Sequence, residues 1–273
     1  MHLRLFTVFA ATLLVAPAFA QEDDIFDETL PPPGFSSSQP DFLDLPMDDL
    51  DLDLDEPAGD STPAETAEAA PAGDPSELKA LEIVLPDPYF GGTPLDYSSP
   101  ILEKPDFKPR PDYMVPGDVT NIALNKPVMT SDSAKAGVPG QINDGDTAYG
   151  QDSVLMLPVG HQYAQIDFGG AHELYALLLW HFHEGERVYF DVVIQISDDE
   201  AFTENVRTGF NNDHDNTLGL GEGKDLEYIE DYRGKFIELD KQTAVAIRFH
   251  SNGNTTDDFN HYVEAQVFGR PVN

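Results

Sequence analysis

The chain has 273 residues, with 50 Asp or Glu against 15 Lys or Arg, a formal net charge of -35 and no cysteine. This charge disfavours nucleic acid and anionic membrane surfaces as partners, because the chain would repel a polyanion. The lack of cysteine excludes disulfides, thiolate metal sites and cysteine nucleophiles.

The first 20 residues have the pattern of a signal peptide. Arg4 gives a positive start, residues 5–15 are apolar or small, and Ala18, Phe19 and Ala20 fit a small-x-small cleavage site. The apolar run is too short for a permanent transmembrane helix, and no other stretch is long and apolar enough. We therefore expect an exported chain, either periplasmic or extracellular and at the cell surface, without a transmembrane segment.

Residues 21–77 are expected to form a disordered, acidic tether. The wider stretch 21–117 carries 24 Asp or Glu, four Lys or Arg and 17 of the 22 prolines. Such a segment cannot bury enough apolar surface to offset chain entropy. Residues 41–60 alternate Asp with Leu, but a half-buried strand would place like charges along one face. A short interaction motif or a calcium-attracting patch are the alternatives for this run.

Residues 78–117 are apolar enough to pack, yet rich in proline. The run LEIVL at 81–85 and several Tyr and Phe residues supply the apolar surface. Prolines every few residues argue against regular structure. The segment is expected to be either an extended arm lying on a folded domain or a plain linker, and a protein partner could be recruited through residues 21–117.

Residues 118–273 have the composition of one all-β domain. Strands are expected at 163–168, 174–182, 187–196, 244–250 and 261–268, separated by clusters of Gly, Asn and Asp. In the stretch 187–196, alternation places Val188, Phe190 and Val192 on one face, and Asp191 and Gln195 on the other. Many short strands with turn signals predict a β-sandwich or barrel.

Four segments, in order, resemble discoidin domains, also called coagulation-factor V/VIII C-type domains. They are NIALNKPV at 121–128, INDGD at 142–146, YAQIDFG at 163–169 and VEAQVFG at 263–269. The resemblance covers roughly residues 118–271 and implies a galactose-binding-like, jelly-roll β-sandwich. The segments WHFH, FNNDHDN and SNGNT also resemble those of bacterial exported proteins with this domain. The chain departs from the family at Tyr163, where Trp is usual, and lacks the disulfide of many animal members.

The resemblance implies a structural calcium ion at the INDGD loop. In related sugar-binding modules this loop and the Glu that opens the last strand hold calcium, so the implied ligands are Asp144 or Asp146, Thr147 and Glu264. Clustered oxygen atoms suit calcium. The alternative is a tight turn in which Asp and Gly only shape the backbone.

A second oxygen-rich loop follows at 211–217. Its spacing, together with Glu222, matches the offsets of a calcium loop, with Asp213 and Asp215 as candidate metal ligands. Asn216 stands where an EF-hand needs Gly. The loop is therefore an irregular ion-binding or ligand-facing loop, or a polar hairpin loop.

His181 and His183 lie two residues apart and share a face of the expected strand. They are candidate metal ligands or sugar contacts, the alternative being ordinary hydrogen bonds at a strand end. Trp180, the only tryptophan, is expected in the core. If it is buried, Tyr189, Tyr228, Tyr232 or Tyr262 would have to provide a stacking platform for sugar.

Arg248 and the following polar residues form the last candidate site. Amides and a lone Arg beside loops suit bidentate hydrogen bonds to sugar hydroxyls. The alternative is that the amides fill tight turns and that Arg248 pairs with a local acid. The remaining candidate contacts are Asn252, Asn254, Asn260 and His261.

No motif of a catalytic site is present, so we do not expect an enzyme. The sequence predicts an exported, non-catalytic module that binds carbohydrate on a cell envelope or in extracellular polysaccharide through loops at one end of the sandwich. The alternative is a structural or protein-interaction component of the envelope whose acidic arm recruits a partner.

Overall fold

The computed structural model describes residues 73–272, except residues 90, 91, 93, 95, 107, 149–152 and 186. The expected signal peptide, residues 1–20, lies outside the described residues. So do residues 21–72 of the expected tether, including the run of alternating Asp and Leu. Within the described part of the chain, no helix has the length and apolar character needed to cross a bilayer.

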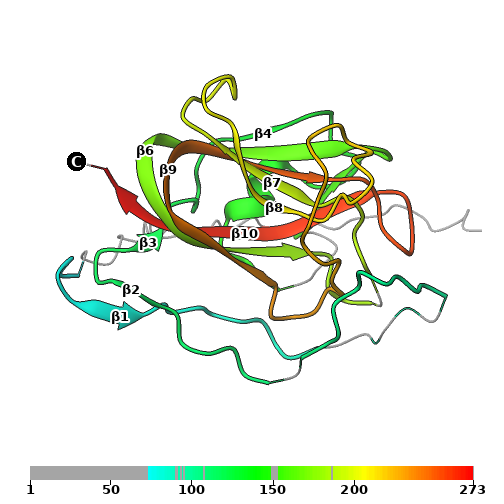
Figure 1. Ribbon diagram of the computed structural model, residues 1–273, viewed down its shortest axis with the longest axis horizontal. Coiled ribbons are helices and arrows are strands. Elements are labelled where there is room, and N and C mark those ends of the chain that lie inside the picture. Colours follow the sequence, from blue (N-terminus) through cyan, green and yellow to red (C-terminus); the bar gives the residue numbers. More distant parts are fainter. Residues whose placement is uncertain are drawn as a thin grey trace, which may run out of the picture. The chain divides into compact units, whose positions relative to one another are not determined.

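The expected all-β sandwich is the fold observed (Figure 1). The strand order is β3-β10-β6-β9-β7-β8, with β4 paired to β6 and β5 paired to β10. All these pairs are antiparallel. The strands of this sheet are β3 (Thr120–Asn121), β4 (Val128–Thr130), β5 (Leu155–Leu157), β6 (Gln162–His181), β7 (Val193–Ser197), β8 (Arg207–Asn211), β9 (Lys235–Ser251) and β10 (Asn260–Pro271).

Two long strands, β6 and β9, run through both layers of the sandwich and curve together (Figure 1). The expected strands 163–168 and 174–182 are the two halves of β6, joined without a break. The bend falls at Gly169 and Gly170, whose φ angles are 76° and 155°. Glycine is suited to this position because a side chain is strained at positive φ. On β9, Asp240 and Lys241 are also at positive φ and lie in a second register shift, opposite Tyr175 of β6.

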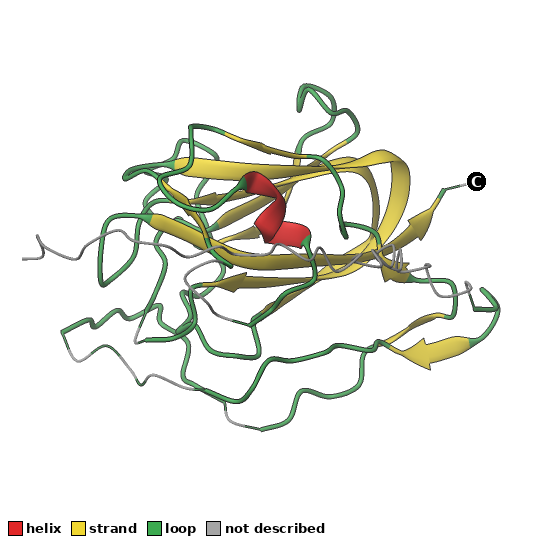
Figure 2. Ribbon diagram, turned by 180° about the vertical axis from the view of Figure 1, so that it is seen from behind, coloured by secondary structure: helices red, strands yellow, loops and turns green. Residues whose placement is uncertain are grey.

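The main core lies between the two layers and contains alternate residues of the strands. Leu177 and Leu179 of β6, Ile247 and Phe249 of β9, and Val267 of β10 belong to it. Their neighbours in sequence point to the outside of the layers, as expected for strands. A short 3₁₀ helix, η1 (Pro139–Asn143), packs beside β10 (Figure 2).

A second apolar cluster covers the outer face of the layer that contains β10. Trp180 and Leu178, which alternate with the core residues of β6, belong to this cluster. The segment 78–117, which we call the arm, packs on it through Leu81, Ile83 and Tyr113. The arm begins and ends in a small two-stranded sheet, β1 (Leu78–Ala80) and β2 (Met114–Pro116). The sandwich therefore has a third layer of mostly irregular chain.

The expected strand 187–196 is wrong in its first half. Only Val193–Ser197 forms a regular strand, β7. Asp191 has a φ of 52°, and this left-handed conformation turns the chain before β7 begins. Val188 and Tyr189 form only isolated bridges, to Ile229 and Asn254.

Candidate functional site

The loops that follow β6 and β9 meet at one end of the sandwich. The backbone nitrogen of Asn252 donates to Phe190 at 2.9 Å, and that of Thr255 donates to Val188 at 3.0 Å. At the same end, the Ser251 hydroxyl, at the end of β9, hydrogen-bonds Tyr262 of β10. The loop segments 182–192 and 252–259 are therefore fixed against each other.

A pocket of about 490 Å³ opens between these two loops and the arm. Phe182 forms part of its wall, and the guanidinium of Arg187 lies 4.3 Å from the centre of the Phe182 ring. Nη1 of Arg187 donates to Asp257 at 2.9 Å and to Asn254 at 3.3 Å. The rest of the wall is polar or small: Asp96, Glu184, Gly185, Thr255 and Thr256. We call this the Arg187 pocket.

The Arg187 guanidinium is oriented by its contacts on two sides. The aromatic ring fixes its plane and Asp257 fixes one nitrogen, so that little side-chain freedom remains to be lost on binding. Nε and Nη2 of Arg187 have no hydrogen-bond partner among the described residues. A pair of adjacent hydroxyls can accept hydrogen bonds from such a planar donor pair, while the Thr hydroxyls and Glu184 supply further partners.

His261 lies beneath the Arg187 pocket. Its Nδ1 is 3.1 Å from the Tyr189 hydroxyl, and its side chain is buried. Burial lowers the pKa of His261 to about 4, although nearby Asp257 opposes the shift. The imidazole is therefore neutral at neutral pH, and it supports Tyr189 and Phe182 from inside.

The amides at this end mainly hold the loops together. Both Nδ2 hydrogens of Asn260 are donated to carbonyls, those of Pro158 and Gly160, while its Oδ1 accepts from Ser251 and Gly253. Asn260 therefore has no free group for a ligand. The side chain of Asn254 is likewise used within its own loop, with bonds to Asp257 and Phe259.

Arg248 lies apart from the Arg187 pocket, on the outer face of the layer that contains β7. Its guanidinium sits between two aromatic rings, 4.4 Å from the Tyr163 centroid and 4.1 Å from the Phe202 centroid. Nε of Arg248 donates to Gln165 at 2.6 Å. The structure therefore separates Arg248 from Asn254 and His261, with which the sequence grouped it.

The two histidines of the WHFH segment make internal hydrogen bonds. Nδ1 of His181 is 2.7 Å from Oε1 of Glu230, and both side chains are fully buried. His183, also buried, has its Nε2 3.0 Å from the Thr147 carbonyl oxygen. Neither histidine faces the Arg187 pocket. Trp180 is fully buried, as expected, and its indole donates to the Tyr232 carbonyl.

The proposed stacking substitutes are also mostly unsuitable. Tyr189, Tyr228 and Tyr262 are buried, while Tyr232 is half-buried. The aromatic ring that does reach the pocket is Phe182, which the sequence reasoning missed. Because Phe182 directly follows the last residue of β6, the sequence could have placed it at the loop end of the sandwich.

The INDGD loop meets β10 at Glu264. The Gly145 nitrogen donates to Oε2 of Glu264 at 3.2 Å, and Oε1 of this fully buried carboxyl has no hydrogen-bond partner among the described residues. Burial raises the pKa of Glu264 to about 8, and Asp144 and Asp146 raise it further. A buried carboxylate oxygen without a donor fits a cation. The carboxylates of Asp144 and Asp146 instead accept hydrogen bonds within their own loop.

A group of three carboxylates lies on the second oxygen-rich loop. Oxygen atoms of Asp191, Asp213 and Asp215 all lie within 4.8 Å of one another and could hold a metal ion. Asp213 and Asp215 were expected here, but Asp191 was not. It joins them because its left-handed backbone interrupts the strand on which the sequence had placed it. Asn252 is the neighbour of this group, since its amide donates to Asp191 at 2.8 Å.

The comparisons with known proteins found similarity in structure only. No protein-family model matches the sequence, and no curated protein matches it. A chitosan-binding module of a chitosanase/glucanase from Paenibacillus is 19% identical, with a TM-score of 0.41 over 55% of this chain and 99% of that module.

Two further solved structures are similar to this chain. A CBM32 module produced by Clostridium perfringens, in complex with GlcNAc-α-1,4-galactose, is 20% identical, with a TM-score of 0.40 over 55% of this chain and 94% of the other. A fucose-binding module of Streptococcus pneumoniae is 19% identical, with a TM-score of 0.39 over 54% and 96%. The names of these three structures describe modules that bind chitosan, GlcNAc-α-1,4-galactose and fucose, respectively.

Proposed function

We propose that residues 118–272 form a non-catalytic carbohydrate-binding module of an exported protein, and that the Arg187 pocket holds the sugar. The observation that carries the proposal is the Arg187 guanidinium, which is oriented by Phe182 and Asp257 and whose Nε and Nη2 have no partner among the described residues. Planar donors beside hydroxyl and carboxylate groups, in an open pocket of this size, suit a sugar ring.

A neutral sugar fits the charge of this pocket. Asp257 neutralises Arg187, and Asp96 and Glu184 add negative charge at the wall. Acidic residues are good acceptors for sugar hydroxyls but repel a carboxylate or sulfate. The ligand proposed for the Arg187 pocket is therefore a neutral glycan of a cell envelope or extracellular polysaccharide.

Calcium is proposed as a structural cation, not as a participant in chemistry. Glu264 with the Gly145 loop, and the group of Asp191, Asp213 and Asp215, are the two places where it would bind. In both places a cation would neutralise buried or crowded carboxylates and fix a loop at its position.

The test is a glycan array with the mature chain, followed by calorimetric titration of the sugars that bind. Arg187→Ala should weaken binding by about tenfold or more, since an Arg anchor often dominates such a site. Arg207→Ala is the matched control, because Arg207 also pairs with an Asp, at 2.8 Å, but does not line the pocket. The control should bind as the unmodified chain does.

Two results would overturn the proposal. One is the absence of binding to every glycan, together with capture of a protein through residues 21–117, which favours the envelope-interaction alternative. The other is glycan binding that Arg187→Ala leaves unchanged, which would move the site away from this pocket.

A further inference from the structure

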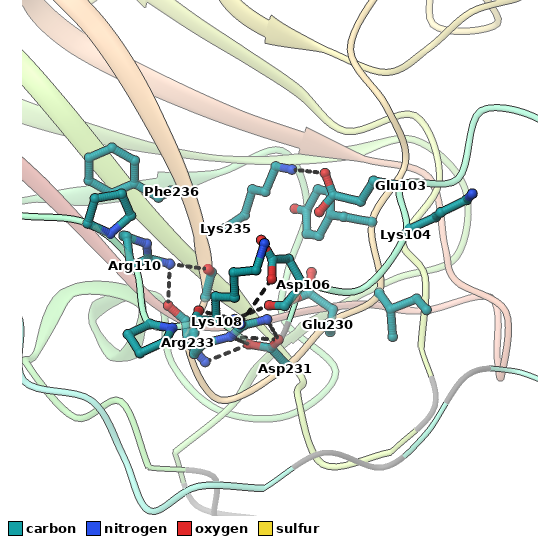
Figure 3. Close-up of a pocket in the computed structure, with 15 residues that line it drawn as sticks. Glu103, Lys104, Asp106, Lys108, Arg110, Glu230, Asp231, Arg233, Lys235 and Phe236 are labelled. Carbon is teal, nitrogen blue, oxygen red and sulfur yellow. Dashed lines mark hydrogen bonds and ion pairs between the residues drawn. The ribbon is translucent and has the colours of Figure 1, made fainter.

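A second pocket lies where the arm crosses the segment that leads into β9. Its volume is about 330 Å³, which is within the range of small-molecule sites. Described residues between Glu103 and Pro111 form one wall, and residues between Tyr228 and Phe236 form the other (Figure 3). We call it the arm pocket. It exists only because residues 78–117 pack on the sandwich.

The arm pocket gathers positive charge in a strongly negative protein. Five of the 15 Lys and Arg residues of the chain line it, while the whole chain carries a formal charge of -35. Three come from the arm and two from the opposite wall, so the cluster is made by the tertiary structure. The five are Lys104, Lys108, Arg110, Arg233 and Lys235.

Most of the acidic groups at the arm pocket are already paired. Glu103 accepts from Lys235 at 2.7 Å, and Asp231 accepts from Arg233 at 2.5 Å. Glu230 is buried and hydrogen-bonded to His181. The first two pairs neutralise two of the five cations. Among the described residues, Asp106 and the buried Glu230 have no Lys or Arg partner.

Three cations remain without a carboxylate partner among the described residues: Lys104, Lys108 and Arg110. Both lysines are exposed, with Lys108 beside Arg110 and Lys104 at the edge of the group (Figure 3). The unpaired charge at the arm pocket is therefore positive, in contrast to the Arg187 pocket.

Arg110 is the fixed member of this group. Its Nη2 donates to the carbonyls of Arg233 and Gly234, at 3.1 and 3.0 Å, and its guanidinium lies 5.1 Å from the Phe236 centroid. Burial lowers the pKa of Arg110, and the charge of Arg233 lowers it further. A partly desolvated guanidinium next to another cation is stabilised by an incoming anion.

The remaining polar groups suit hydroxyls. The carboxylates of Asp106 and Glu103 are acceptors at the wall, and Phe236 contributes ring surface. We propose that the arm pocket binds an acidic sugar, with its carboxylate toward Lys108 and Arg110 and its hydroxyls toward Asp106 and Glu103. This site differs from the Arg187 pocket in place and in ligand charge, and it does not rest on the function proposed for that pocket.

The fluorescence of Trp180 should report ligand binding at the arm pocket. It is the only tryptophan, its indole donates to the Tyr232 carbonyl at 2.9 Å, and Gly234 packs on its ring. Arg110 binds the carbonyl of the same Gly234. A ligand that engages Arg110 should therefore change the Trp180 fluorescence, and calorimetry gives the affinity independently.

The experiment titrates the mature chain with D-galacturonate, D-galactose and sodium sulfate at constant ionic strength and at neutral pH. Galacturonate should bind more tightly than galactose or sulfate. The double variant Lys104→Gln, Lys108→Gln should weaken galacturonate binding about tenfold or more, because charge-assisted hydrogen bonds are lost. The matched control is Lys135→Gln, Lys224→Gln, which removes two exposed lysines that do not line the pocket.

Three outcomes would overturn the proposal. They are galacturonate binding no tighter than galactose, sulfate binding as tight as galacturonate, and equal binding by the double variant and its control. Arg187→Ala, measured alongside, separates the two sites. It should leave galacturonate binding unchanged even if binding at the Arg187 pocket fails.

Discussion

His181 and Glu230 are hydrogen-bonded at 2.7 Å in the interior of the sandwich, and neither side chain is exposed. The imidazole also stacks on Tyr189, with ring centroids 4.2 Å apart. The His181–Glu230 bond joins the end of β6 to the segment that forms one wall of the arm pocket. Tyr189 in turn hydrogen-bonds His261, which lies under the Arg187 pocket. The two pockets therefore share a buried polar support.

Glu230→Leu should lower the free energy of unfolding by about 1–3 kcal/mol, since it leaves a buried nitrogen of His181 without its partner. The double variant His181→Phe, Glu230→Leu should be more stable than Glu230→Leu alone, because no polar group is then stranded. Urea unfolding of the wild type, both single variants and the double variant measures this coupling. Strictly additive losses would show that the pair is not coupled.

The pH dependence of stability should contain a contribution from Glu264. Its pKa is raised from 4.5 to about 8 by burial, so the folded state holds a proton that the unfolded state has released. The stability that the protonated Glu264 contributes to the folded state is fully present below about pH 4.5 and is lost as the pH rises toward 8. In chelator, thermal unfolding should show a smaller loss of stability from pH 5 to pH 8 for Glu264→Gln than for the wild type.

Bound calcium should favour the ionised form of Glu264, whereas burial favours its protonated form. A cation favours the ionised carboxylate, so added calcium should raise the melting temperature more at pH 8 than at pH 5. Glu264→Gln should reduce this gain, while Glu238→Gln, an exposed position on β9, should retain it. An equal gain in all three proteins would place the ion elsewhere, for example at Asp191.

Gly234 should tolerate a side chain much less well than Gly219. Both have positive φ, 65° and 71°, but an added Cβ at Gly234 would lie 2.6 Å from the Trp180 ring, whereas nothing lies within 4 Å at Gly219. Alanine at Gly219 should cost about 1–2 kcal/mol of stability from backbone strain. At Gly234 overpacking should add about 1–3 kcal/mol. Denaturant unfolding of the two variants gives the difference, and equal losses would contradict the close packing on Trp180.

The arm should be needed for the stability of the sandwich. Leu81, Ile83 and Tyr113 cover a cluster that includes Trp180, and Tyr113 donates to the Tyr175 carbonyl at 3.2 Å. A chain that starts at residue 118 would expose this apolar surface to water. It should melt at a lower temperature and aggregate more than a chain that starts at residue 73. Equal melting temperatures would show that the arm contributes no net stability.

Much of the strand pattern could be predicted from the sequence. The regions 163–168, 174–182, 244–250 and 261–268 are all strand or lie almost wholly within strands, because alternating and β-branched residues favour a pleated surface. The failure at 187–192 has a local cause, the left-handed Asp191. Alternation in sequence could not reveal it, since Asp fits the solvent face of a strand equally well.

The candidate site was harder to predict. The sequence pointed to loops at this end of the sandwich, but it chose polar residues such as Asn260 and His261, whereas the proposed site centres on Phe182 and Arg187. The side chain of Asn260 already makes four hydrogen bonds, two to carbonyl oxygens and two from donors. Whether a polar side chain has hydrogen-bonding capacity left for a ligand depends on its spatial neighbours, which the sequence does not show. Glu264 was singled out through the resemblance of the last strand to the family motif, and its role as a calcium ligand stays a prediction.

The sequence by itself determined the all-β class and the sharp change in composition near residue 118, because periodicity and charge density are local properties of the chain. The tertiary structure decided which charges meet. Lys108 and Arg233 are far apart in sequence but line one pocket, and Asp191 joins Asp213 across a turn. Electrostatic interactions depend on distance in space, so the net charge of -35 concealed a positive pocket that only folding assembles.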